Sequence, residues 1–192
     1  MSKLYAQVIK NFLFEDEIHA LNNWTLNNWQ NHYFDDACMD SNNPGTRFTT
    51  RMNNELVVKE TGIVINYPKE CYNIQERIKQ FFNLYDYHHP PSFYDGIVNG
   101  IGFSPGLIEE HIDPVYIKGT NTLHCNVITK NCISGGITII EGNQFPVDEG
   151  DLLMYIVSKH KHKVTNIVGD VNRILWVFGF CIDDEKLEEI FN

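Results

Sequence analysis

The second half of the chain is a succession of short segments rich in β-branched and aromatic residues, with no helical periodicity. Clusters of glycine, asparagine, aspartate and proline separate these segments, and such clusters usually mark turns. Many short strands at this spacing are typical of a β-sandwich or a β-barrel. We expect strands near residues 95–103, 107–112, 122–129, 136–141, 151–157, 162–168 and 173–181.

The first half predicts a strand and two helices. Residues 3–13 have the composition of an opening strand. Acidic residues at 15–17 favour a helix N-terminus, and an apolar face continues through about residue 29. We interpret its members as core residues rather than a ligand platform: Ile18, Leu21, Trp24 and Trp29.

A second helix is predicted to begin at Pro68 and to pack against the outside of a sheet. Its apolar face recurs at spacings of three and four: Cys71, Ile74, Ile78 and Phe81. Residues 183–192 indicate a short, exposed terminal helix.

Length and composition favour one globular domain. The chain has 192 residues, 43% hydrophobic and 12% aromatic, enough for a sizeable core. We expect a single domain over 1–192, with a strand, helices and a loop in 1–92 and a jelly-roll core in 93–182. No apolar run is long enough to span a membrane, and the start lacks a signal-peptide pattern. Five scattered cysteines predict buried free thiols in a reducing cytoplasm.

The net charge of −10 argues against a nucleic-acid partner, because duplex-binding proteins usually carry a basic stripe. A nucleotide held by a few local arginines is still compatible with this charge. Nothing in the sequence specifies an oligomeric state.

A polar segment over 31–55 interrupts the regular pattern. Long loops in compact domains are often functional, and this one ends in Arg47 and Arg51. Two interpretations stay open: solvated arginines on an edge strand, or a lid whose arginines meet a carboxylate or phosphate of the substrate.

One short motif carries metal-binding chemistry. His111 and Asp113 are two residues apart, and this spacing points both side chains to one face of an extended segment. A histidine and a carboxylate are two thirds of the triad that holds non-haem Fe(II) with open coordination positions. His160 and His162 offer the third ligand. Arg173 opens a strongly apolar strand and needs an anionic partner there.

These residues resemble the Fe(II)- and 2-oxoglutarate-dependent dioxygenases, most closely the small prolyl-hydroxylase-like branch. The family pattern is a His-x-Asp, a distal histidine and an arginine or lysine about ten residues further on. Three supporting segments also match it, all within the resemblance over residues 96–181: Phe103-Ser104-Pro105-Gly106, Gly135-Gly136-Ile137-Thr138 and Gly150-Asp151-Leu152-Leu153-Met154-Tyr155.

The resemblance implies a double-stranded β-helix (jelly roll), mainly β, with two N-terminal helices packed on one sheet. It implies that His111, Asp113 and His162 bind Fe(II) and that Arg173 holds the far carboxylate of the cosubstrate 2-oxoglutarate. With O2, such enzymes hydroxylate an unactivated C–H bond and release succinate and CO2. Because Asp113 is present, hydroxylation is favoured over halogenation.

The choice of His162 over His160 rests on the spacing. Two residues apart in a strand, both histidines would face one way, so parity does not separate them. Counting from His162 places Arg173 eleven residues on, one more than usual, and the extra residue fits the turn at 169–172.

Further candidates come from strand faces. The strand at 122–129 places Thr122, His124 and Asn126 on one face, where they would line a pocket. Tyr155 shares the strand that leads to the distal histidine. We expect His124, Asn126 and Tyr155 near the cosubstrate, and Arg47, Arg51 and Tyr116 near the substrate.

Two other functions compete with this enzyme. A non-catalytic jelly-roll module could keep the metal ligands, although such modules usually lose a ligand or the arginine. A cupin-type isomerase or hydrolase would need a His-x-His after the glycine-rich turn, and the pair at 160/162 comes too late. The expected substrate is a free amino acid, a peptide residue or a similar small molecule.

Overall fold

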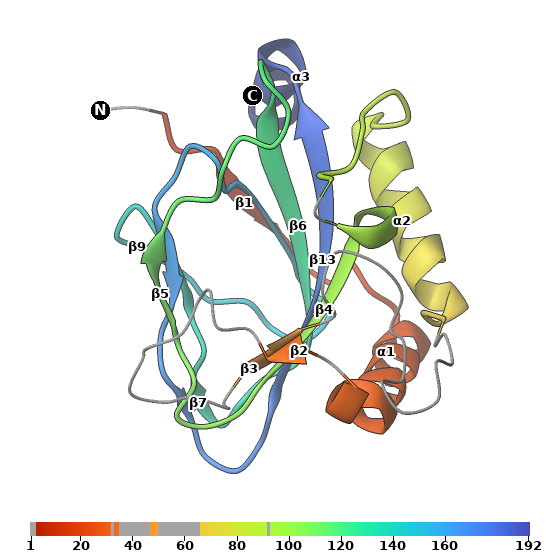
Figure 1. Cartoon of the computed structure of the whole chain (residues 1–192), viewed down its shortest axis with the longest axis vertical. Coiled ribbons are helices and arrows are strands. Elements are labelled where there is room, and N and C mark those ends of the chain that lie inside the picture. Colours follow the sequence, from red (N-terminus) through yellow and green to blue (C-terminus); the bar gives the residue numbers. More distant parts are fainter. Residues whose placement is uncertain (1–2, 32, 35–46, 50–65, 92) are drawn as a thin grey trace.

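The structure is a computed structural model that describes residues 3–31, 33–34, 47–49, 66–91 and 93–192. Over these residues two antiparallel sheets of seven and four strands face each other, with a two-stranded ribbon at one end. Figure 1 shows β5 and β9 of the smaller sheet on one side, and α1 and α2 beyond the larger sheet on the other. This is the double-stranded β-helix that the family resemblance implies.

The strands of the larger sheet come from both ends of the chain, and they are, in spatial order, β1 (Ala6–Ile9), β10 (Leu152–Ile156), β6 (Asn121–Lys130), β13 (Arg173–Ile182), β4 (Ile97–Gly102), β3 (Arg47–Thr49) and β2 (Tyr33–Phe34). The smaller sheet comprises β5 (Ile108–His111), β11 (His162–Val164), β8 (Thr138–Ile140) and β9 (Asn143–Phe145). The ribbon pairs β12 (Ile167–Val168) with β7 (Ser134–Gly135). The single strand expected over 162–168 is therefore two strands, because its second part leaves the smaller sheet to pair with β7.

The two N-terminal helices begin where the sequence indicates. In α1 (Glu15–Asn28) the Glu17 carboxylate accepts a hydrogen bond from the Phe14 backbone N–H at 2.9 Å, which satisfies one free amide of the first turn. A 3-10 turn, η1 (Trp29–Asn31), follows. Helix α2 (Lys69–Phe82) starts directly after Pro68 and ends at Asn83, whose left-handed φ of 51° closes the helix. A second 3-10 turn, η2 (Tyr94–Gly96), leads into β4.

The main core lies between the larger sheet and these helices. Alternation along β13 places Ile174, Trp176 and Phe178 in this core, where they meet Leu21 of α1 and Ile74 of α2, both fully buried. The opposite parity of β13 faces the smaller sheet. The strand period of two thus separates a structural face from a functional one.

The predicted apolar face of α2 is wrong at one position, Phe81. Phe82 is buried with Ile78, whereas Phe81 is 64% exposed. The buried positions of α2 continue from Ile78 by four residues rather than three, which moves the last core position from Phe81 to Phe82.

The prediction of buried free thiols is confirmed for three of the four cysteines in the described part of the chain. Cys71, Cys125, Cys132 and Cys181 are free, and all except Cys132 are buried. Cys38 lies outside the described residues. No helix in that same part is long and apolar enough to cross a membrane.

The C-terminal helix α3 (Asp184–Phe191) is not the exposed helix that the sequence suggests. Leu187 is only 1% exposed and belongs to the main core, and Lys186 is buried beside it. One apolar side of α3 docks on the core. It is difficult to recognise in the sequence because the segment is short and carries many charges.

Replacing Leu187 with alanine tests this docking. Loss of a fully buried leucine side chain should lower the free energy of unfolding by about 2–5 kcal/mol, measured by urea denaturation. The exposed neighbour Glu185 provides the control, and Glu185→Ala should change stability by less than about 0.5 kcal/mol. Equal, small effects of both substitutions would mean that α3 does not dock.

Candidate metal and cosubstrate site

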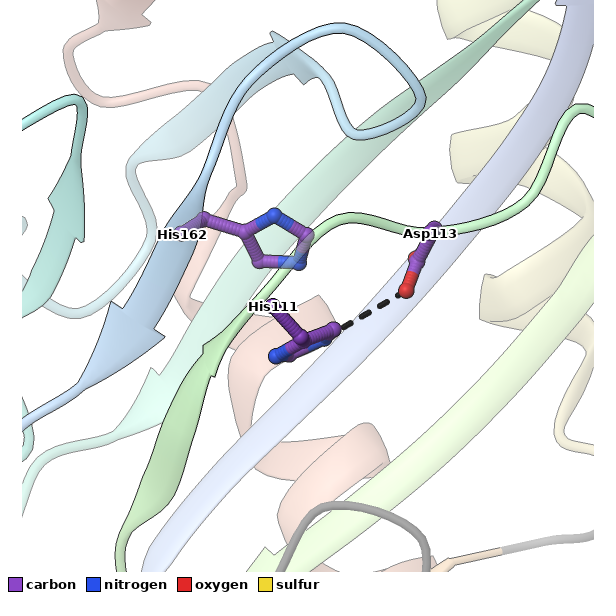
Figure 2. Close-up of side chains that lie close together, drawn as sticks. All are labelled: His111, Asp113 and His162. Carbon is purple, nitrogen blue, oxygen red and sulfur yellow. Dashed lines mark ion pairs between the residues drawn. The ribbon is translucent and has the colours of Figure 1, made fainter.

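The smaller sheet brings two histidines and one aspartate together. His111 ends β5, His162 begins β11, and the antiparallel register places these two residues opposite each other. Asp113 follows two residues after His111. Their ligand atoms lie within 4.8 Å of one another, and Figure 2 shows the three side chains converging, with the His111–Asp113 pair dashed. Strand pairing therefore brings the two histidines together, and the segment after β5 adds Asp113.

A β-bulge aims His111 into the interior. The register steps from Ile108 opposite Val164 to His111 opposite His162, so three residues of β5 span two of β11. Ile108 and His111 consequently both line the same cavity, although they are three residues apart. Bulges often redirect side chains next to active sites.

His111 and Asp113 both line the cavity, as their spacing of two residues predicts. Strand β5 ends at His111, so hydrogen bonds within that strand do not position Asp113. The backbone N–H of Asp113 instead donates to the Val157 carbonyl at 3.0 Å, which fixes the segment after the strand. The His111 Nε2 atom lies 3.3 Å from Asp113 Oδ1.

Backbone carbonyls orient both imidazoles. The Nδ1 atom of His111 lies 2.7 Å from the Glu109 carbonyl, and that of His162 lies 3.0 Å from the His160 carbonyl. A ring that donates its Nδ1–H to a carbonyl presents a lone pair on Nε2, as metal-binding histidines usually do. Both rings are thus oriented so that Nε2 can bind a metal ion.

The surroundings keep Asp113 ionised and His124 neutral. Burial raises the pKa of Asp113, but the contact with His111 and the nearby His124 and His162 outweigh it, so this pKa is lower than usual. Burial lowers the pKa of His124 to about 4, despite the nearby Asp113 carboxylate. Two histidines and one carboxylate, as in His111, His162 and Asp113, form a ligand set that is typical of non-haem Fe(II).

The trio opens into a cavity of about 310 Å³ between the two sheets. Arg173, the first residue of β13, lines this cavity and is only 4% exposed. Gly136 makes room for it: a Cβ atom there would lie 2.8 Å from Arg173 Cδ, and its φ of 63° suits glycine. The second glycine of the pair that the sequence highlights therefore accommodates the arginine.

The cavity contains most of the other predicted residues. His124, Asn126, Tyr155 and Tyr116 all line it, and the Asn126 amide lies 3.4 Å from the Tyr155 hydroxyl. Arg47 belongs to β3, opposite Gly102 of β4, which also pairs with Arg173 on its other side. The side chain of Arg47 and all of Arg51 lie outside the described residues, as does most of the predicted lid, so that prediction stays open.

Several lining residues were not predicted. Leu175 and Val177 share the parity of Arg173 along β13, and this signal could have identified them. Thr138 appears in the glycine-rich motif but was not named as a site residue. Thr49 lies between Arg47 and Arg51 in the segment 31–55, and Phe93 comes from a segment without any functional pattern.

His160 lies away from the cavity, so the assumption that both late histidines face one way is wrong. Its Nε2 atom accepts a hydrogen bond from the Tyr5 backbone N–H at 3.0 Å, and its ring packs on that of Tyr5. Strand β11 begins only at His162, and His160 belongs to the preceding turn.

Comparisons with known proteins identify the fold. No protein-family model matches the sequence, and no curated protein matches it. Among solved structures, a prolyl-4-hydroxylase from Pseudomonas putida is similar, with a TM-score of 0.65, 10% identity and coverage of 94% of each chain. A collagen prolyl hydroxylase of Paramecium Bursaria Chlorella virus-1, in complex with 2-oxoglutarate, has a TM-score of 0.64 and 12% identity over 93% of this chain and 96% of that one.

HygX from Streptomyces hygroscopicus, with nickel and 2-oxoglutarate bound, has a TM-score of 0.62 and 9% identity over 93% of this chain and 83% of its own. A second structure of HygX also contains hygromycin B. Such identities establish the fold and no more. The chain has the double-stranded β-helix fold of the prolyl hydroxylases and related 2-oxoglutarate oxygenases.

Proposed function

We propose that this protein is an Fe(II)- and 2-oxoglutarate-dependent dioxygenase that hydroxylates a C–H bond and releases succinate and CO2. One observation carries the proposal: two histidines and an aspartate converge at a cavity that also holds a buried arginine. A metal ion and a dicarboxylate together match these groups. We further propose that residues 1–192 form one catalytic domain around the jelly-roll core.

The chain's own residues fit both ligands. The Nε2 atoms of His111 and His162 and the carboxylate of Asp113 would hold Fe(II). The guanidinium of Arg173 would hold the far carboxylate of 2-oxoglutarate by a bidentate, charge-assisted interaction. The bound metal and cosubstrate supply the activation of O2 for C–H oxidation.

Other cavity residues would orient and shield the reactants. Asn126 and Tyr155 present an amide and a hydroxyl on the inner face of neighbouring strands, where a carboxylate could accept from them. Leu175 and Val177 form an apolar wall on β13. Apolar walls lower the local dielectric constant, and charged interactions within the cavity are stronger as a result.

We propose a free amino acid, a peptide residue or a similar small molecule as the substrate. The solved relatives include collagen prolyl hydroxylase and HygX with hygromycin B, so this fold serves both peptide and small-molecule chemistry. Tyr116 and Pro114 line the cavity with Asp113 and would contact such a substrate.

The proposal is tested by measuring succinate formation from 2-oxoglutarate with Fe(II) and O2, in the presence of metabolite and peptide pools. Mass spectrometry then seeks a product that has gained one oxygen atom. We expect substrate-dependent succinate formation, lost in Asp113→Ala. Binding of metal and 2-oxoglutarate without succinate formation from any pool would instead assign the chain as a non-catalytic binding module.

A further inference from the structure

A third histidine, His124, faces the Asp113 carboxylate from the opposite sheet. It lies on β6, opposite Tyr155 of β10, and its Nε2 atom is 3.8 Å from Asp113 Oδ2. The other carboxylate oxygen, Oδ1, is the one that lies 3.3 Å from His111. The two oxygens of Asp113 thus face different histidines.

The imidazole of His124 is confined. The residue is 9% exposed, and its ring lies between those of Phe93 and Tyr155, with centroids 5.2 Å and 6.2 Å away. Within the described residues its Nε2 atom is buried without a hydrogen-bond partner. Leaving a buried polar atom unpaired costs about 1–3 kcal/mol, so this placement points to a ligand or a charged neighbour.

A direct metal bond does not explain His124 as well as a bond to Asp113 does. The compact group of ligand atoms contains His111, Asp113 and His162, and His124 is not part of it. A carboxylate that binds a metal through one oxygen keeps lone pairs on the other. In a buried cavity that second oxygen needs a donor.

We propose that His124 is a positioning residue whose Nε2–H donates to Asp113 Oδ2 when Asp113 binds the metal through its other oxygen. A shift of about 1 Å brings the present 3.8 Å to hydrogen-bonding distance. This contact holds Asp113 as a one-oxygen ligand and thereby keeps coordination positions open. The inference rests on the proposed metal site and adds a role for a residue outside it.

Substitutions of His124 separate a hydrogen-bonding role from a packing role. His124→Leu removes the donor but keeps an apolar side chain, whereas the amide of His124→Gln can present an N–H near the position of Nε2. Co(II) affinity should weaken about 10–100-fold in His124→Leu and stay within about threefold of the unsubstituted protein in His124→Gln. Titrations use the visible absorption of bound Co(II), which also reports the coordination number.

The dependence on Asp113 is tested in a double-mutant cycle. In the Asp113→Ala background, His124→Leu should change Co(II) affinity by less than about twofold, because its partner is gone. His19 on α1 is largely exposed, so His19→Leu serves as the matched control and should leave Co(II) affinity unchanged. Thermal melts of each variant without metal verify that it is folded.

Each outcome decides the question. Weak binding in His124→Leu, recovery in His124→Gln and no effect in the Asp113→Ala background support the positioning role. Three results would overturn it. They are an unchanged Co(II) affinity in His124→Leu, an equal loss of affinity in His124→Leu and His124→Gln, or an equally large effect of His124→Leu in the Asp113→Ala background. If the unsubstituted protein binds no Co(II), the proposed function fails instead, so the two failures are distinguishable.

Discussion

Replacing His162 with alanine should abolish Fe(II)-dependent succinate formation, whereas replacing His160 should leave a substantial fraction of it. His162 is 6% exposed and belongs to the group of converging ligand atoms. Its loss leaves one imidazole and one carboxylate for the metal. Both turnover and Co(II) binding are measured, so that a metal-binding defect is seen directly.

His160→Ala should mainly affect stability. It removes the acceptor for the partly buried Tyr5 N–H, which should cost about 1 kcal/mol of unfolding free energy. The carbonyl that orients His162 is a backbone atom and survives the substitution. If this variant is too unstable to assay, His160→Gln restores an acceptor near the same place. Full activity in His162→Ala, with loss in folded His160 variants, would reverse the assignment.

Face alternation was predictable because it depends only on neighbouring residues. The sequence placed His124 and Asn126 on the face opposite Leu123 and Cys125, and the structure confirms this division. The same parity along β13 separates Arg173 from Trp176. No long-range information was required, since a strand fixes the direction of each side chain relative to the next.

The direction of His160 was not predictable, because distant residues set it. Its partners are Tyr5, 155 positions earlier, and Glu141, whose carboxylate lies 3.7 Å from its Nδ1 atom. The bulge between β5 and β11 was not predictable for the same reason. The sequence shows the spacing of His111 and Asp113, but the three-against-two register depends on the partner strand.

Closure of the cavity also escaped prediction. Phe93 follows the helical half of the chain and shows no motif, yet it packs on His124 and lines the cavity. A Cβ atom on Gly179 would lie 2.6 Å from the Phe93 ring, so β13 accepts this ring only because glycine is present. Such fits between remote segments leave no periodic signal.

Replacing Arg173 with leucine should raise the KM for 2-oxoglutarate steeply while metal binding survives. Arg173 is buried at the opening of β13 and lines the cavity that contains the three metal-binding side chains. Removing one partner of a buried charge pair costs about 2–4 kcal/mol, which corresponds to roughly 30- to 900-fold in KM. Arg173→Lys keeps the charge but loses the planar fork of the guanidinium. Its KM should therefore fall between those of the unsubstituted protein and Arg173→Leu.

Two further variants make this result specific to the cavity. Arg77 joins α2 to Glu17 of α1 by an ion pair, so Arg77→Leu should reduce stability without changing the KM for 2-oxoglutarate. Gly136→Ala should raise that KM although the arginine is intact, because its Cβ atom would lie 2.8 Å from Arg173 Cδ and displace the guanidinium. If Arg173→Leu left KM unchanged while lowering stability, the arginine would be a structural residue, and the anion-binding end of the cavity would have to lie elsewhere. Because Co(II) affinity is measured on the same variants, a collapsed metal site cannot imitate the loss of the carboxylate contact.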